Sequence, residues 1–269
     1  MFKDIDIFNQ VKQYGFALID AKLIAETDKL NSYIVDNFTL NVSDFYYSLL
    51  ENNFEQNKVI EKTLIKILNP FYQNFFTEIK VLNQSFLSKP AHTKEELFLH
   101  QDWSYTDNEQ YSSYNLWIPL TDISEENGAM FFIPGSHLWF DNIISASLPT
   151  ARIVTSKFLS SKIHTVKIKR GQVLIFHPSV FHGSFPNFSQ HNRIVVTATI
   201  LQKNAPFLYF HQSEIKDEVK VFSLEKDTFL KDLKMLAMGG QPASTEIKRM
   251  KYLHSIITEQ ELKLKILAQ

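Results

Sequence analysis

Short apolar runs, rich in β-branched and aromatic residues, fill the middle of the chain from Val81 to about Gln202. In order they read VLNQSFLS, LFLHQDWS, YNLWIPLT, AMFFIP, IHTVKIK, QVLIFH and RIVVTATIL, a composition typical of strands. Turn dipeptides separate several of them: Asn127-Gly128, Pro134-Gly135 and Arg170-Gly171. No regular helices stand between the runs, as parallel βαβ units would require. Roughly seven or eight strands in this arrangement predict a double-stranded β-helix, the jelly roll of cupin-like folds.

The segments on either side of this core have a different spacing of apolar residues. Residues 1–80 carry helix-like apolar spacing, interrupted at Tyr14-Gly15 and at Asn69-Pro70, which predicts N-terminal helices packed against the jelly roll. After residue 202 the pattern is mixed, apart from a helix that the apolar spacing predicts over Glu246–Leu267. We therefore expect one mainly β domain over residues 1–269: a helical part over about 1–80, the jelly-roll core over about 81–202, and a C-terminal extension over about 203–269 that covers the active site or packs on the core.

Charge and cysteine content exclude several classes of function. Lys and Arg number 28 against 29 Asp and Glu, a net charge of −1, so the chain has no general attraction for nucleic-acid phosphates. No apolar stretch approaches the roughly 18 to 20 residues of a membrane helix, and the start MFKDIDIFNQ lacks the pattern of a signal peptide, so we expect a cytoplasmic protein. The sequence has no cysteine, which excludes disulfides, thiolate metal sites and cysteine nucleophiles. Any metal must be bound by imidazole and carboxylate.

The strongest candidate for a metal site combines the segment LFLHQDW with a histidine far along the chain. His100 and Asp102 are two residues apart on a predicted strand, so both side chains leave the same face. His182 follows the apolar strand QVLIF, from which a jelly roll can return it beside this pair. Two imidazoles and one carboxylate suit iron(II) and leave coordination positions for other ligands. The alternative is that these histidines are hydrogen-bonded structural residues.

An anion site is predicted from a single arginine. Arg193 begins the strand RIVVTATIL, whose apolar character predicts burial, and a buried guanidinium needs an anion. A dicarboxylate held by a bidentate contact would supply it, with Ser184 as a neutral hydrogen-bonding partner. The alternative is a structural arginine paired with an acidic side chain.

Four motifs together resemble the phytanoyl-CoA dioxygenase family of iron(II)- and 2-oxoglutarate-dependent oxygenases. They are HQD at His100–Asp102, NLWIPL at Asn115–Leu120, ENGAMFFIPGSH at Glu126–His137, and HGS at His182–Ser184 followed by Arg193. The likeness runs from YGFALID near Tyr14 to about Gln202. It implies an enzyme that binds Fe(II) through His100, Asp102 and His182, consumes O2, and binds 2-oxoglutarate through Arg193 and Ser184. It implies no catalytic residue beyond the metal ligands.

The resemblance also implies three further contacts. Trp117 matches an aromatic position beside the co-substrate. The segment NQSFLSKPAH resembles the ectoine hydroxylase branch, in which a lysine at the position of Lys89 contacts 2-oxoglutarate and a glutamine near the position of Gln84 contacts the substrate. The alternatives are a solvated lysine at a strand end and a strand-edge amide.

On this resemblance we expect hydroxylation of an unactivated C–H bond, with release of succinate and CO2, on a small molecule or a carrier-tethered group. Asp102 favours hydroxylation over halogenation, because related halogenases carry a small residue at that position and bind chloride there. Two other functions stay open. One is a cupin-like metal isomerase or hydrolase that does not use 2-oxoglutarate, and the other is a non-catalytic ligand-binding jelly roll. The sequence does not indicate the oligomeric state.

Overall fold

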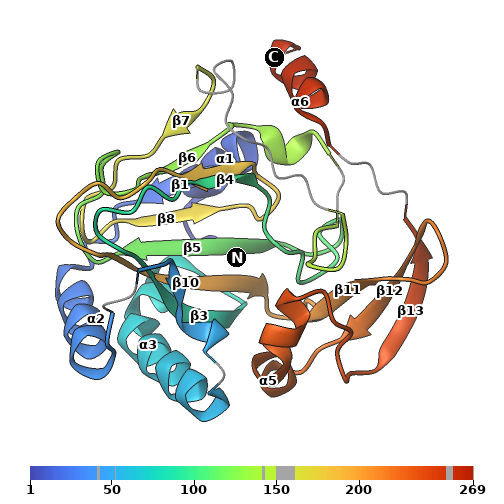
Figure 1. The fold of residues 1–269 in the computed structure, drawn as a ribbon, viewed down its shortest axis with the longest axis horizontal. Coiled ribbons are helices and arrows are strands. Elements are labelled where there is room, and N and C mark those ends of the chain that lie inside the picture. Colours follow the sequence, from blue (N-terminus) through green and yellow to red (C-terminus); the bar gives the residue numbers. More distant parts are fainter. Residues whose placement is uncertain (41–42, 52, 141–142, 150–160, 253–256, 269) are drawn as a thin grey trace.

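Two antiparallel sheets that face each other form the centre of the computed structural model, which describes residues 1–269 except 41–42, 52, 141–142, 150–160, 253–256 and 269. The larger sheet has six strands in the order β1-β8-β5-β10-β3-β2, and the smaller sheet has four in the order β4-β9-β6-β7 (Figure 1). The pairings between these described strands are antiparallel. The prediction of a mainly β jelly-roll core with flanking helices is confirmed.

The elements have the following bounds. The larger sheet contains β1 Phe16–Ile19, β2 Tyr46–Tyr47, β3 Ile79–Lys89, β5 Ser113–Pro119, β8 Val173–Phe176 and β10 Arg193–Gln202, and the smaller contains β4 Leu97–His100, β6 Met130–Phe132, β7 His164–Thr165 and β9 His182–Ser184. A third sheet contains β11 Leu208–Gln212, β12 Glu218–Ser223 and β13 Glu246–Lys251. The helices are α1 Ile5–Tyr14, α2 Ile24–Asn37, α3 Phe54–Phe75, α5 Lys226–Ala237 and α6 Glu259–Leu267, with short 3-10 turns at Ser48–Leu50 and Ser136–Leu138. No helix in the described part of the chain is long and apolar enough to span a membrane.

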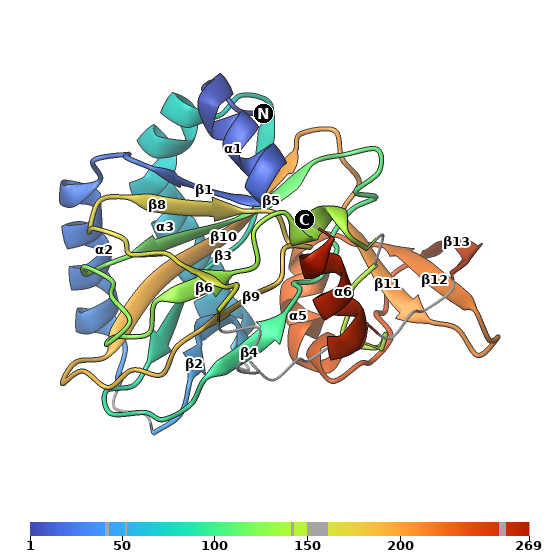
Figure 2. The same cartoon turned by 90° about the horizontal axis from the view of Figure 1, so that it is seen from above.

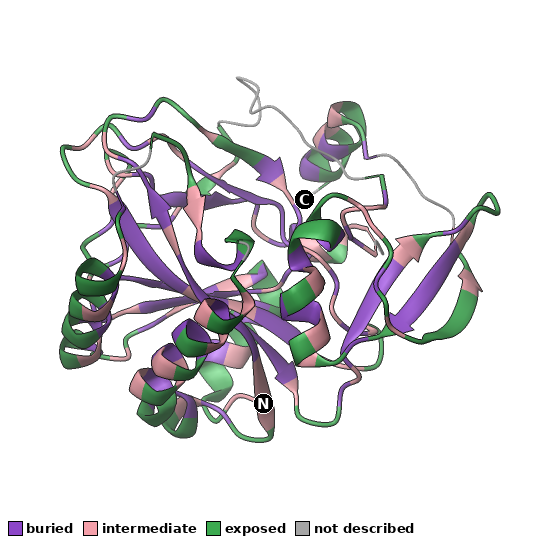
Figure 3. Ribbon diagram, turned by 60° about the horizontal axis from the view of Figure 1, so that its bottom comes forward, coloured by how far each residue is buried: buried purple, intermediate pink, exposed green. Residues whose placement is uncertain are grey.

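Alternating side chains give the larger sheet two buried faces. Along β8, Val173 and Ile175 pack with the N-terminal helices, whereas Leu174 and Phe176 pack into the space between the two sheets. The helices α1, α2 and α3 lie on the outer face of this sheet (Figure 2), and each is exposed on the side that faces away from it (Figure 3). Strands buried on both faces read as continuous apolar runs, which is why QVLIF shows no polar alternation.

Of the two breaks predicted in the N-terminal helices, the first is confirmed and the second is wrong. Helix α1 ends at Gly15, which adopts the left-handed conformation with φ 86° and donates its N–H to the carbonyl of Val11. Glycine adopts this conformation without the steric cost of a side chain. Helix α3 instead continues through Pro70, although proline removes one helix hydrogen bond. Burial of Leu68 and Phe71 against the sheet outweighs that loss.

The helix predicted over Glu246–Leu267 is wrong in its first part. Residues Glu246–Lys251 form β13, which pairs with β12, and a helix begins only at Glu259, while residues 253–256 lie outside the described part. Met250 lies opposite Val219 and packs against the apolar cluster of this small sheet. Over so short a window, one face of a strand and one face of a helix give similar spacing.

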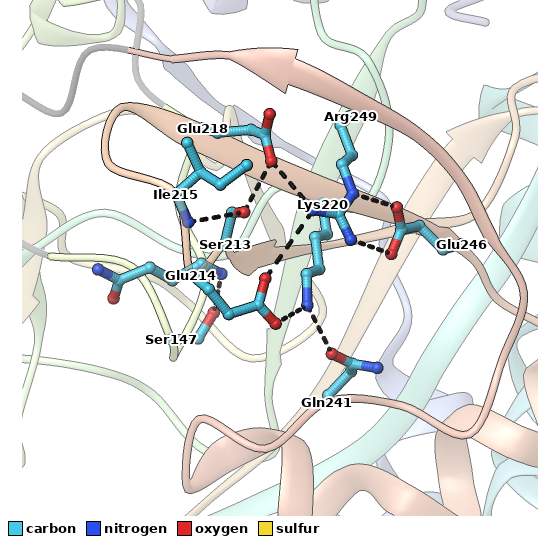
Figure 4. A network of polar contacts seen from close by, with 10 residues as sticks. Ser147, Ser213, Glu214, Ile215, Glu218, Lys220, Gln241, Glu246 and Arg249 are labelled. Atoms are coloured by element: carbon cyan, nitrogen blue, oxygen red, sulfur yellow. Dashed lines mark hydrogen bonds and ion pairs between the residues drawn. The ribbon is translucent and has the colours of Figure 1, made fainter.

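Ion pairs hold the strands of the third sheet together (Figure 4). Lys220 on β12, only 5% exposed, donates to the carboxylate of Glu214 and to the amide oxygen of Gln241. Arg249 on β13 donates across the strands to Glu218 at 3.2 Å. A nearly buried ammonium must be paired, so these contacts stabilise the sheet.

Candidate metal centre and adjoining cavity

The structure brings His100, Asp102 and His182 together between the two main sheets. Strand β4 pairs with β9 so that His100 lies directly opposite His182. Asp102 follows just past the end of β4, where its backbone N–H donates to the carbonyl of Pro178. The Nε2 atoms of His100 and His182 lie 3.6 and 3.5 Å from the two carboxylate oxygens of Asp102. One ligand atom from each residue lies within 4.8 Å of the others, so all three can reach a single ion.

Backbone hydrogen bonds prepare both imidazoles for metal binding. The Nδ1 atom of His100 lies 2.8 Å from the carbonyl of Phe98, and that of His182 lies 2.9 Å from the carbonyl of Val180. A proton on each Nδ1 leaves the Nε2 lone pair on the side of Asp102. Burial lowers the pKa of His182 to about 4, so this imidazole is neutral at physiological pH, as a metal ligand must be.

A chain of polar side chains holds the carboxylate of Asp102. Asn115 on β5 donates from Nδ2 to Asp102 Oδ2 at 2.6 Å, and Thr199 on β10 donates to Asn115 Oδ1 at 2.8 Å. Burial disfavours a charged carboxylate, but the neighbouring imidazoles and the Asn115 amide outweigh it and hold the pKa of Asp102 below its ordinary value. Two imidazoles and one oriented carboxylate fit a divalent transition metal with open coordination positions.

Replacing Asn115 with leucine is expected to weaken iron(II) binding by about 10- to 100-fold, the usual cost of removing a side chain that orients a metal ligand. The change deletes the donor to Asp102 and keeps a side chain of similar size. Anaerobic iron(II) titration measures the effect, with Asn74→Leu on the exposed side of α3 as the matched control. An unchanged dissociation constant for iron(II) would show that Asp102 needs no support from Asn115.

Two buried cations lie on neighbouring strands beside the metal position. Arg193, the first residue of β10, lies opposite Lys89, the last residue of β3, and the two are 3% and 2% exposed. Within the described ranges, no carboxylate lies within ion-pair distance of either side chain. One terminal nitrogen of Arg193 donates to the carbonyl of Gly128 at 2.5 Å, its Nε has no hydrogen-bond partner among the described residues, and its guanidinium lies 5.1 Å from the ring centre of Trp117. Burial lowers the pKa of Arg193, yet an arginine stays protonated in proteins, so this position requires an anion.

Lys89 lies behind the cavity wall. Its ammonium donates to Ser184 Oγ at 2.8 Å and to the carbonyl of Phe185 at 2.6 Å. Burial, and then the charge of Arg193, lower the pKa of Lys89 to about 7. Ser184 lines the cavity, so it lies between Lys89 and any molecule bound there.

Gln84, expected to contact the substrate, does not line the cavity. It is fully buried, accepts from the hydroxyl of Tyr72 on α3, and donates to the carbonyl of Thr197 at 3.1 Å. Strand alternation turns its side chain toward the helices, so both of its polar atoms are used in the fold. The preceding residue, Asn83, lines the cavity.

A cavity of about 360 Å³ adjoins the metal position. It contains the three predicted metal ligands, and Ser184, Trp117 and Arg193 also line it. The other walls come from segments far apart in the sequence. They include Tyr47 before α3, Tyr105 after the metal ligands, and Leu233 and Ala237 of α5.

Strand β9 has three residues, and its first and last residues both belong to this site. His182 and Ser184 line the cavity, and Gly183 between them has no room for a side chain. A Cβ on Gly183 would lie 2.3 Å from the carbonyl oxygen of Leu97 and 2.6 Å from the ring of Phe131. Any other residue would force β9 away from β4 or β6.

Asn115 and Asn83 line the cavity but were not predicted as site residues. Asn115 precedes Trp117 by two residues on one strand, so the alternation of a strand places both on the same face, and that signal was available. Asn83 gives no such signal, because its position depends on an irregular pairing between β3 and β10.

The chain matches known proteins mainly over its jelly-roll core. The family model for phytanoyl-CoA dioxygenase (PhyH) matches residues 20–195. A phytanoyl-CoA dioxygenase domain-containing protein 1 from Bos taurus is 28% identical over 130 residues, which are 45% of this chain and 45% of that protein. A phytanoyl-CoA dioxygenase from Arabidopsis thaliana is 25% identical over 159 residues, 51% of this chain and 54% of that protein. The chain thus spans about half the length of the curated relatives it matches.

Solved structures share the same architecture. The epimerase SnoN, in complex with Fe3+, alpha ketoglutarate and nogalamycin RO, has a TM-score of 0.53 and 16% identity over 76% of this chain and 85% of its own. HygX from Streptomyces hygroscopicus, with nickel and 2-oxoglutarate bound, has a TM-score of 0.51 and 16% identity over 73% of this chain and 86% of its own. These TM-scores show a common fold. The family model covers more than half of the sequence. The chain therefore belongs to the phytanoyl-CoA dioxygenase family.

Proposed function

We propose that this protein is an iron(II)- and 2-oxoglutarate-dependent dioxygenase that hydroxylates an unactivated C–H bond of a small-molecule or carrier-tethered substrate and releases succinate and CO2. The observation that carries the proposal is the buried guanidinium of Arg193, without a carboxylate partner among the described residues, in the same cavity as His100, Asp102 and His182. A metal isomerase or hydrolase could use the three ligands but has no need of an unpaired buried cation beside them. The metal- and 2-oxoglutarate-containing structures of SnoN and HygX support the assignment.

Different residues of the site bind the metal and the co-substrate in this proposal. The two imidazoles and Asp102 would hold iron(II), which would supply the binding site for 2-oxoglutarate and O2. Arg193 pairs with the distal carboxylate of 2-oxoglutarate, Ser184 hydrogen-bonds to it, and Lys89 adds positive potential from behind Ser184. Bound iron with 2-oxoglutarate and O2 supplies the oxidising power, which no side chain in the cavity could supply.

The protein also determines which outcome follows. Trp117 and the other apolar walls exclude water from the reacting position and hold the substrate against it. With Asp102 as a ligand, the iron would lack the free site that a halide needs, which favours hydroxylation.

Anaerobic reconstitution with iron(II) and 2-oxoglutarate tests the proposal. We expect one iron per chain, a metal-to-ligand charge-transfer absorption when 2-oxoglutarate is added, and succinate formation once O2 is admitted. A metabolite screen for products that gain one oxygen atom then searches for the substrate. Iron binding without 2-oxoglutarate binding would support a metal isomerase or hydrolase, and binding of neither would support a non-catalytic jelly roll.

The affinity for 2-oxoglutarate is expected to fall as the pH rises above about 7. Without a bound anion the pKa of Lys89 is lowered to about 7 by burial and by Arg193. A carboxylate bound nearby raises that pKa, because an opposite charge favours the protonated form. The complex therefore takes up a proton on forming, and its affinity falls by up to about tenfold per pH unit above the lower pKa.

Titrations of 2-oxoglutarate between about pH 7 and pH 9 measure this dependence. Lys89→Met is expected to remove it, and Lys94→Met, at an exposed lysine, is expected to retain it. Identical slopes for Lys89→Met and the unmodified protein would place Lys89 away from the bound anion.

A further inference from the structure

Charged side chains line one end of the cavity, and uncharged side chains line the rest. Among its described lining residues, the ionisable groups near the metal are Asp102, its two histidine partners and Arg193, and the proposed function uses all of them for iron and 2-oxoglutarate. The other large side chains are apolar or aromatic and include Phe45, Tyr47, Leu87, Trp103, Tyr105 and Leu233. No lysine, glutamate or further aspartate lines the described walls. A charged substrate group would lose water there without gaining a partner.

The rim of the cavity is apolar as well. Phe45, Leu50 and Leu97 line the cavity and keep 39%, 41% and 43% of their surfaces exposed. They come from the segment before α3 and from β4, which are far apart in the sequence. A substrate therefore passes apolar side chains before it reaches the metal.

One polar residue on these walls has an unusual backbone. Strand β3 bulges against β10: Ser85 lies opposite Thr197 and Leu82 opposite Thr199, so two residues of β3 face only one of β10. Asn83, the first of the two, has φ 54°, in the left-handed region that asparagine tolerates better than most residues. Bulges of this kind redirect a side chain next to an active site.

The carboxamide of Asn83 belongs to a small neutral polar cluster. Its side chain lies beside the hydroxyl of Tyr105, and the side chain of Ser85 lies beside the hydroxyl of Tyr47. The hydroxyls of Ser85 and Thr197 lie 3.0 Å apart. A carboxamide carries two donor hydrogens and an acceptor oxygen, so Asn83 can bind a neutral group in the cavity even with Tyr105 beside it.

We propose that the primary substrate is an uncharged, mainly apolar, ring-bearing molecule that packs between the aromatic walls and is oriented by a hydrogen bond to Asn83. The inference rests on the proposed function, because it takes the metal position as the reacting end of the cavity. Flat aromatic walls favour a flat or ring-shaped partner. Only the uncharged end of a carrier-tethered substrate would enter, with its phosphate groups outside.

A matched pair of probes tests the charge preference. Naphthylacetamide and naphthylacetate have nearly the same shape and differ in charge, and their dissociation constants are measured by calorimetry on the anaerobic complex with iron(II) and 2-oxoglutarate. We expect the amide to bind at least about tenfold more tightly, because the acid must bury an unpaired carboxylate. Equal or tighter binding of the acid, or binding of neither probe, would overturn the substrate class.

A glycine variant tests Asn83. Asn83→Gly removes the amide and keeps a residue that adopts positive φ easily, so the bulge is retained. We expect the amide probe to bind about 3- to 10-fold more weakly, the effect of one hydrogen bond, with 2-oxoglutarate affinity unchanged. Lys22→Gly is the matched control, since Lys22 has φ 54° and lies outside the cavity. Unchanged amide affinity, or an equal loss for both probes and 2-oxoglutarate, would overturn the role of Asn83.

The two proposals fail in different ways. Absence of the 2-oxoglutarate charge-transfer band counts against the proposed function, before any probe is added. When the band forms, Arg193 is paired with 2-oxoglutarate, and absence of a preference for the amide probe then overturns the substrate class alone.

Discussion

Alanine in place of His100, Asp102 or His182 is expected to lower oxygen-dependent succinate formation by more than about a hundredfold, because losing a ligand costs more than losing a residue that only orients one. Each residue contributes one of three ligand atoms that lie within 4.8 Å of one another. Two ligands cannot hold the ion in a fixed orientation, and an iron that moves cannot present its open positions to the cavity. Succinate is measured at saturating iron(II) and 2-oxoglutarate.

The matched control for the histidine variants is His92→Ala, at an exposed histidine outside the site. Circular dichroism and thermal unfolding show whether each variant keeps its fold. A folded variant with full activity would remove that residue from the metal site.

Replacing Arg193 with alanine is expected to weaken 2-oxoglutarate binding by about 2 to 5 kcal/mol, the scale for removing one partner of a desolvated charge pair. Iron(II) binding is expected to persist, because Arg193 is not among the three grouped ligands. Arg193→Lys recovers only part of the loss, since one ammonium cannot reproduce a planar two-point contact. Titration of 2-oxoglutarate into the anaerobic iron complex, followed through the charge-transfer absorption, gives the dissociation constants.

Two controls separate anion binding from damage to the fold. Arg170→Ala removes a surface arginine that pairs with Asp28 and is expected to leave the 2-oxoglutarate dissociation constant unchanged. Arg193→Met is expected to unfold at the same or a higher temperature than the unmodified protein without 2-oxoglutarate, because it removes a buried charge that lacks a counterion. An unchanged dissociation constant in folded Arg193→Ala would place the carboxylate contact elsewhere.

The core of the fold was predictable because its signal is local. Strand β8 is apolar on both faces, so QVLIF reads as a buried strand wherever its neighbours lie. His100 and Asp102 are likewise a local pair. Their meeting with His182 depends on the pairing of β4 with β9, which no local pattern specifies, and it was expected from the jelly-roll topology and the family motifs.

The residues whose positions were not predicted from the sequence depend on partners distant in the chain. Gln84 turns toward Tyr72 because β3 is covered by α3 on that side. Asn83 faces the cavity because β10 forces a bulge at that point. Pro70 is tolerated because the helix around it is buried against the sheet, and a local rule for proline does not include that burial.

The geometry of β9 also fixes the distance between His182 and Ser184. His182 and Ser184 are two strand positions apart, roughly 6.5 Å along the backbone. Gly183, packed against Leu97 and Phe131, prevents the strand from shifting. Under the proposed function, this fixed distance would set the length of a diacid that reaches from the metal to Ser184. A diacid one methylene longer or shorter would lose contact at one end, so the main chain of this short strand would select among 2-oxo diacids.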